Sequence, residues 1–225
     1  MRHLSLALIA GVSLITANAA FAGDGDEVKR DVVTEYDFSG FDKVDISGVY
    51  TVEIRQGDRF SVRTEATKDK ARWSEVKMKG DTLVLGKKDR KKGWWKDDDY
   101  EDQGGVHAFV TMPRLTELDV SGVTNGTVSA FSGGSIEVDA SGVANLTLSG
   151  SCDHLEIDAS GVSNIDAEAL LCASVEVDAS GVSNLEVYAS NRIEADSSGM
   201  SEIGVHGNPA DREIEDSRMA KVVMR

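Results

Sequence analysis

The sequence is poor in proline, cysteine and aromatic residues. Of its 225 residues, 2 are Pro and 2 are Cys, and Phe, Trp and Tyr together make up 6%, whereas Gly is plentiful at 22. The remaining apolar residues are mainly Val, Ile, Leu and Ala. Branched aliphatic residues favour strands and glycine favours turns, so this balance argues against a helical protein and for a β-rich, turn-rich one.

Histidine is also scarce, which bears on catalysis and metal binding. The histidines are His3, His107, His154 and His206, and none has metal-ligand spacing to another. The chain has no nucleophile elbow and no phosphate loop. We therefore predict a protein that is not an enzyme and assign no catalytic residue. Asp and Glu pairs are plentiful, so a glycan-cleaving site built from two carboxylates stays open as an alternative.

Positive charge is in deficit along the whole chain. There are 24 Lys and Arg against 39 Asp and Glu, a net charge of −15. Removal of Arg2 with a cleaved leader would give 23 − 39 = −16. Such a charge argues against nucleic acid and anionic membrane surfaces as partners. It favours solubility, cations or a basic partner.

Long apolar runs are confined to the start of the chain. Leu4–Ile15 is an apolar run of 12 residues, short for a bilayer span, behind a basic Arg2-His3. Ala20-Phe21-Ala22 fits the small-x-small rule for signal cleavage. We predict a signal peptide over 1–22 and a disordered leader over 23–31. The mature protein is then exported, periplasmic or at the surface of a bacterium, and not transmembrane.

What the sequence does contain is a repeat. The pattern Asp-x-Ser-Gly-apolar occurs five times with glycine spacings of 20, 19, 20 and 18. A fixed period near 20 made of short alternating segments predicts an all-β, single-stranded parallel β-helix with coils of about 20 residues. Weaker copies at 45–49 and 213–219 extend the repeat, so we expect one domain over 32–225. The repeated glycines are Gly122, Gly142, Gly161, Gly181 and Gly199.

Most of the repeat can be explained as a corner of the coil. A repeated glycine supplies a conformation or a close approach that a Cβ would forbid. The Asp can accept hydrogen bonds from the Ser two residues on or from the backbone of the turn. Equivalent asparagines can hydrogen-bond along the stack. These asparagines are Asn125, Asn145, Asn164 and Asn184.

Two acidic columns are harder to explain by structure alone. In-register stacking would place like charges about 5 Å apart, at a cost of about 1 kcal/mol per pair in water. The carboxylates could be solvated, could bind cations, with calcium favoured by an all-oxygen site, or could receive a basic partner. The members are Glu117, Glu137, Glu156, Glu176 and Glu194 in one column, and Asp119, Asp139, Asp158, Asp178 and Asp196 in the other.

The two cysteines lie 20 residues apart, in equivalent places of adjacent repeats. Cys152 and Cys172 each precede the first residue of a predicted strand by three positions. Stacked positions fall within the Cα separation that a disulfide needs, and export permits oxidation. We predict a disulfide from Cys152 to Cys172.

A charged segment interrupts the strands between a predicted hairpin at 76–86 and the repeats. Residues 86–105 run from basic through Trp94-Trp95 to acidic. We predict a surface loop. The two tryptophans could stack on a sugar, or they could fold back and cover the domain.

The segments FSGFDKVDISGVYTVEIRQGD (38–58) and PRLTELDVSGV (113–123), with the SGV and SGM repeats, resemble the bacterial auto-transporter adhesin, head GIN domain family. The resemblance covers nearly all of the mature chain. It implies an exported envelope protein with a parallel β-helix fold, taken as right-handed, and residues 32–225 as a GIN-type domain. No catalytic motif carries over.

The resemblance implies adhesin-like, non-enzymatic binding of a surface glycan or protein, with oligomers open. Two other functions remain as alternatives. One is a polysaccharide-active enzyme, a lyase or hydrolase, because parallel β-helices host such chemistry. The other is a purely structural envelope or matrix protein.

Overall fold

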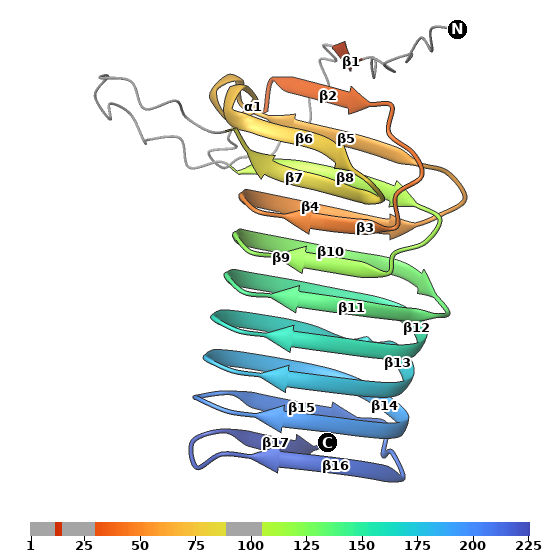
Figure 1. Cartoon of the computed structure of the whole chain (residues 1–225), viewed down its shortest axis with the longest axis vertical. Helices are drawn as coiled ribbons and strands as arrows, with labels where there is room; N and C mark the ends of the chain where they lie inside the picture. The colour runs from red at the N-terminus through yellow and green to blue at the C-terminus, as the bar shows by residue number, and fades with distance from the viewer. Residues whose placement is uncertain (1–11, 15–29, 89–104) are drawn as a thin grey trace, which may run out of the picture.

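The computed structural model describes residues 12–14, 30–88 and 105–225, and most of them lie in strands. From β9 onward the chain alternates between two parallel sheets, as Figure 1 shows. It runs along the front strands, turns, and returns behind them one step lower, which makes the coil right-handed (Figure 1). The all-β, parallel β-helix prediction is confirmed, with about five turns.

The front sheet carries the segment of each repeat that precedes the glycine corner. The back sheet carries the segment that follows it. Strands β12–β14 are long because they continue around the far edge from the back sheet into the front sheet. The strands of this stack are β3 (Lys43–Ile46), β4 (Val49–Gln56), β9 (Glu117–Val120), β10 (Val123–Ser132), β11 (Ser135–Ala140), β12 (Val143–Ala159), β13 (Val162–Ala179), β14 (Val182–Ser197), β15 (Glu202–His206), β16 (Asp211–Asp216) and β17 (Lys221–Met224).

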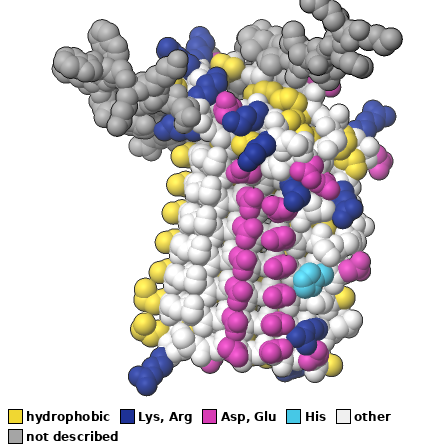
Figure 2. All heavy atoms as spheres, viewed as in Figure 1, with side chains coloured by type: hydrophobic (Ala, Val, Ile, Leu, Met, Phe, Trp, Pro, Cys, Tyr) yellow, Lys and Arg dark blue, Asp and Glu magenta, His cyan; other side chains and the backbone are white. Residues whose placement is uncertain are grey.

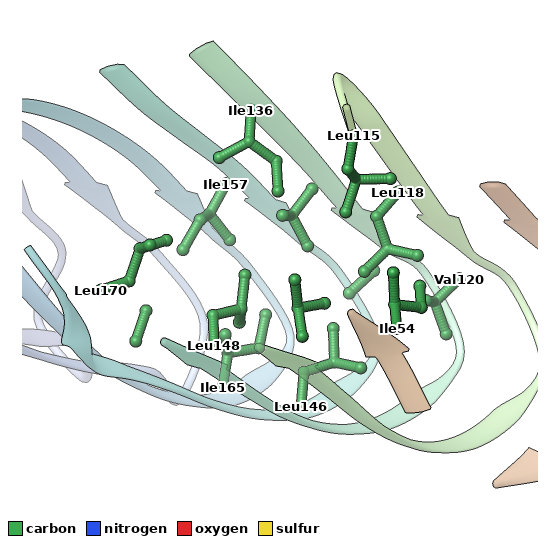
Figure 3. Close-up of a cluster of buried hydrophobic side chains, with 14 of the residues drawn as sticks. Ile54, Leu115, Leu118, Val120, Ile136, Leu146, Leu148, Ile157, Ile165 and Leu170 are labelled. Carbon is green, nitrogen blue, oxygen red and sulfur yellow. The ribbon is translucent and has the colours of Figure 1, made fainter. Parts of the chain in front are cut away.

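The stack is in register, so equivalent residues of successive repeats lie opposite one another. Val138 pairs with Ile157, and Ile157 pairs with Val177. Because side chains alternate across a strand, every second residue points between the two sheets. Figure 3 shows these aliphatic side chains facing each other, among them Leu118, Ile157 and Leu146. They are buried, so the core is a thin aliphatic layer repeated at each turn.

The repeated glycines form the corners, as the sequence indicated. A Cβ added to Gly142 would lie 2.1 Å from the carbonyl oxygen of Gly122, and one on Gly161 would lie 2.6 Å from that of Gly142. Gly161 also has a φ of +97°, in the left-handed region. Backbone therefore lies directly on backbone at the corners from Gly122 to Gly199, and from Gly161 onward a positive φ requires glycine in addition to the contact.

The N-terminal part of the domain is built differently. The strands β2 (Val32–Tyr36), β5 (Ser61–Ala66) and β8 (Val106–Met112) pair antiparallel, as do β6 (Ser74–Lys79) and β7 (Thr82–Lys87). The pair β6–β7 confirms the predicted hairpin. A six-residue helix, α1 (Lys68–Trp73), follows β5 and was not predicted. We call β2, β5–β8 and α1 the antiparallel cap; β7 and β8 join it to the stack by pairing parallel with β3 and β4.

The predicted signal peptide, the leader and the charged loop lie almost entirely outside the described residues. One exception is β1 (Val12–Leu14), within the predicted signal peptide, which pairs antiparallel with β2. Cleavage and export stay predictions. Trp94 and Trp95 also lie outside the described residues.

Candidate binding faces

The acidic columns stand side by side on the front sheet, as predicted. Glu117, Glu137 and Glu156 pair in register, and the Glu column continues to Glu213. The Asp column runs beside it from Asp119, with Asp45 before it and Glu215 after it. Figure 2 shows both columns as continuous lines of carboxylates. The alternation of the strands places both on the outer surface, because Leu118 and its equivalents between them point inward.

Stacking like charges alters their titration. Burial raises the pKa of Asp119 to about 6, helped by a hydrogen bond to Asp139 and by the neighbouring acidic charges. Burial and the adjacent carboxylates also raise the pKa of Glu137, Asp158 and Glu176. Each shift has the sign expected when the charged form is disfavoured. The middle of the columns therefore holds an excess of negative charge that the fold itself does not neutralise.

Cations do compensate the two ends of the Glu column. Lys43 occupies the position before Glu117 and forms an ion pair with it. Arg192 forms ion pairs with Glu194, Asp211 and Glu213. Among the described residues, no cation pairs with Glu137, Glu156 or Glu176. The unpaired part of the face is thus its centre.

A groove runs along the Asp column. It has a volume of about 660 Å³ and extends over successive repeats. Its walls are the Asp column and the serines that precede the corner glycines, and buried alanines such as Ala159 form its floor. The polar residues that line it are Asp139, Asp158, Asp178, Asp196, Glu215 and Asp216, with Ser141, Ser160, Ser180, Ser197, Ser198 and Ser217. We call it the Asp–Ser groove.

In the sequence, those serines indicate turn residues only. The signal that could have revealed the groove is the repeated triplet Asp-Ala-Ser, in which a small residue separates two polar ones that face outward. Repetition of that triplet on stacked strands leaves a channel between two polar lines.

A second groove of about 500 Å³ lies on the back sheet, and the sequence pattern did not indicate it. Its walls are neutral amides and hydroxyls from β10 and β12, with Glu53, Arg55 and His107 at one end. The His107 ring Nε2 lies 3.0 Å from the Glu53 carboxylate. Asn145 donates to the Asn125 side-chain oxygen at 3.1 Å, and Asn184 repeats this with Asn164. The predicted asparagine column therefore exists, and it also lines a groove.

The disulfide prediction is confirmed. Cys152 and Cys172 are opposite each other on β12 and β13, bonded, with their Cα atoms 4.5 Å apart. Both side chains are buried. The bond therefore stabilises one turn of the stack against the next and is not available to a partner.

Two other properties bear on function. Across residues 12–14, 30–88 and 105–225, no three His, Cys, Asp or Glu side chains are grouped as a metal ion would require. The same ranges hold no helix long and apolar enough to span a bilayer. Calcium binding by the acidic columns stays a prediction.

Residues 40–209 match the family model described as "Putative auto-transporter adhesin, head GIN domain". The chain belongs to this family. The match covers the first stack strands, the antiparallel cap except β2, and the acidic columns up to Asp196. The family resemblance given by the sequence motifs is confirmed. No protein of curated function matches the chain.

Solved structures with the same fold come from the bacterial genera Bacteroides and Parabacteroides. A "putative adhesin" of Bacteroides fragilis is 19% identical, with a TM-score of 0.70 over 86% of this chain and 96% of that one. A "putative adhesin" of Parabacteroides merdae is 14% identical, with a TM-score of 0.50 over 86% and 95%. At such identities the likeness shows the fold alone.

Proposed function

We propose that this protein is an exported, non-enzymatic, adhesin-like component of the bacterial cell envelope, which binds a surface glycan or protein along the Asp–Ser groove. The observation that carries the proposal is the groove itself: one chemical unit, a carboxylate facing a hydroxyl, repeated on successive turns. A groove of this kind fits an extended partner better than a small molecule. It also gives no single residue a privileged role.

The charge of the groove limits the chemical class of partner that can bind there. The central carboxylates lack ion pairs with described cations, and burial together with the acidic neighbours raises the pKa of Asp158. A partner that brings positive charge, or many hydroxyl donors, would relieve this repulsion. An anionic partner would add to it. We therefore expect a basic protein segment or a neutral or amine-bearing glycan.

Stepwise neutralisation of the groove tests the proposal. We would compare Asp158→Asn with the double variant that adds Asp178→Asn, and measure binding to intact bacterial cells and to a glycan array. Binding should weaken in graded steps as each turn is altered, since each contributes a similar contact. Asp58→Asn, in the turn after β4, is the matched control for charge. Full binding by the double variant would contradict a role for the groove.

One observation favours the enzyme as a second candidate. Asp119 and Asp139 lie on adjacent strands, are joined by a hydrogen bond, and the pKa of Asp119 is raised to about 6. A carboxyl whose pKa is raised is what the general acid of glycan cleavage requires. Assays of sugar release on a polysaccharide panel would test it. Activity that disappears in Asp119→Asn but survives in Asp178→Asn would replace adhesion with catalysis.

The third candidate is a purely structural envelope protein. It predicts no saturable binding to cells or glycans by the wild-type protein, with loss of envelope integrity when the gene is deleted.

Calcium is tested separately by thermal melts with millimolar calcium and with chelator. A rise in melting temperature with calcium would place cations on the acidic columns.

A further inference from the structure

An apolar ridge runs along the corner edge of the stack. The residue that follows each corner position is Val or Met, and each is exposed, from 44% at Val143 to 74% at Met219. Of the nine large apolar side chains that are exposed among the described residues, seven belong to this ridge. The ridge consists of Val49, Val123, Val143, Val162, Val182, Met200 and Met219.

The ridge is continuous because its members are in register. Val123 pairs with Val49 and Val143, and Val162 pairs with Val143 and Val182. Met200 and Met219 continue the ridge. Two residues after the ridge positions, Asn184 pairs with Glu202, and Glu202 pairs with Lys221. Figure 2 shows the apolar side chains projecting one per turn along the left edge. A fold needs no exposed valine at this place, so the ridge is a surface feature to be explained.

The ridge also lies on a neutral strip of a strongly acidic protein. On its front side are the corner serines, and on its back side are the asparagines of the predicted column. From Val123 to Val182 the strip Ser-Gly-Val-x-Asn contains no charge, whereas the front sheet carries two acidic columns. Two molecules of net charge −15 can approach closely with least repulsion along such a strip.

We propose that the ridge is the docking surface for a second copy of this chain, packed ridge on ridge in antiparallel orientation. A second copy has the same spacing between turns, about 4.8 Å, so each side chain can enter the gap between two of its partner's along the whole length. A two-fold axis perpendicular to the stack permits this half-step offset. A two-fold axis parallel to the stack would set each residue directly against its own copy.

The exposed area indicates a weak dimer. Full burial of an aliphatic side chain contributes about 1.5–3 kcal/mol, and each Å² of buried apolar surface contributes about 25 cal/mol. Dividing the first by the second gives a surface of roughly 60–120 Å² for one such side chain. Seven half-exposed members in each of two copies would bury about 700 Å². The serines and asparagines beside the ridge must supply the rest of the roughly 1,200 Å² at which specific interfaces begin. We expect dissociation in the micromolar range, with association strengthened by salt, which screens the net charge.

Sedimentation equilibrium from about 1 to 300 μM tests the dimer. The wild-type protein should associate reversibly, and Val143→Asp with Val162→Asp should weaken association at least tenfold. Leu171→Asp is the matched control, because Leu171 is 52% exposed and lies off the ridge. Circular dichroism melts establish that each variant is folded. A wild-type protein that stays monomeric at every concentration, or a ridge variant that associates like the control, overturns the proposal.

Cysteine cross-linking gives a second readout with milder changes. Val162 is the middle member of the ridge, so in an antiparallel pair it lies beside its own copy. Val162→Cys should form a covalent dimer on mild oxidation, and Leu171→Cys should not. Val49→Cys should cross-link only when mixed with Met219→Cys. Self-linking of Val49→Cys would show that the orientation is wrong, and absence of any Val162→Cys dimer would reject the ridge. Neither result bears on partner binding in the Asp–Ser groove.

Discussion

The antiparallel cap and the stack are made from the same kind of strand, yet they fill their interiors differently. The cap and the loops that adjoin β2 and β5 bring dissimilar residues together and use aromatic rings: Phe41 packs on Phe60 with ring centroids 4.9 Å apart, and Tyr36 stacks on Phe38 at 5.5 Å. The stack places each residue on its own equivalent and uses mainly Val, Ile, Leu and Ala. A parallel in-register stack gives every turn the same space, so one side chain of moderate size must fit repeatedly.

Their surfaces differ for the same reason. In the cap, opposite charges meet across or along strands, as in the Arg63–Glu65 pair at 2.9 Å. In the stack, Glu meets Glu and Asp meets Asp. Because the stack is in register, one residue type repeated at the same position of each turn forms a uniform line along the surface, whether acidic, hydroxyl, amide or apolar. Long uniform faces are what the stack offers to partners, and local repulsion accompanies them.

Substitution of glycine by alanine should give the largest difference in lost stability between the stack and the cap. Gly161→Ala puts a Cβ in the left-handed region and 2.6 Å from the Gly142 carbonyl oxygen. Gly80→Ala, in the cap hairpin, has a similar φ of +67° but no atom within 4 Å of the new Cβ. We expect about 1–2 kcal/mol for Gly80→Ala from conformation alone. Gly161→Ala should lose at least about 4 kcal/mol, because backbone must move as well.

Denaturant unfolding of both variants measures this. Equal losses would mean that the corner relaxes freely and that conformation, not contact, selects glycine there.

The stack was predictable from the sequence because repetition determines register. The Gly spacing and the Glu-x-Asp alternation identify the strand period, the inward residues and the acidic columns. Even the disulfide follows, since Cys152 and Cys172 hold equivalent positions. The cap was less predictable: β5 pairs with β2 and β8 antiparallel, and its partners share no repeated pattern. The helix α1 has six residues and no buried side chain, so it has no amphipathic signal.

The grooves and the ridge were not predictable from the sequence for a different reason. Each depends on which residues remain uncovered after folding. The valine after each glycine looks like any strand residue until the corner leaves it exposed, as with Val162 at 54%. Alternation predicts the face on which a residue lies, but it does not predict what covers that face.

The disulfide should give the next largest effect, and it belongs to the stack alone. It closes a sequence separation of 20 residues. Loss of such a loop constraint costs about 3 kcal/mol in the chain-entropy model. We expect Cys152→Ala with Cys172→Ala to lower the free energy of unfolding by roughly that amount while preserving the fold, because Ala189 occupies the equivalent position one turn on. Reducing agent should lower the stability of the wild type and leave the variant unchanged; sensitivity of the variant would point to another cause.

Removal of a single hydrogen bond should cost about 1 kcal/mol more stability where stack and cap meet than on the exposed surface of the stack. Tyr50 donates its hydroxyl to the Gly86 carbonyl at 2.7 Å in a buried position where stack and cap meet. Asn145 donates to Asn125 at the exposed surface. Tyr50→Phe leaves a buried carbonyl without that donor and should cost about 1–2 kcal/mol, whereas Asn145→Ala should cost about 0.5 kcal/mol. Chemical denaturation compares them, and a larger loss for Asn145→Ala would mean that the asparagine column acts cooperatively.

The smallest effect, and one with an unusual sign, concerns the acidic columns. The pKa values of Glu137 and Asp158 are raised in the folded protein, so the folded state holds protons that the unfolded state releases. Their favourable contribution is present below the ordinary carboxylate pKa and is lost as pH rises through the folded value. Asp119 sets the upper end of this window, near pH 6. Thermal melts should therefore show the stack gaining stability as pH falls from 7.5 to about 5.

Two variants that each remove one carboxylate charge test the direction of this effect on stability. At pH 7.5, Glu137→Gln removes repulsion and should stabilise the protein by about 0.5 kcal/mol or less, because the group is largely solvated. Glu65→Gln in the cap removes the ion pair with Arg63 and should destabilise it by a similar amount. Opposite signs from the same chemical change would show that the two regions use charge differently. Destabilisation by both would mean that solvent or bound cations already neutralise the acidic columns, and the calcium melts would then decide between these two.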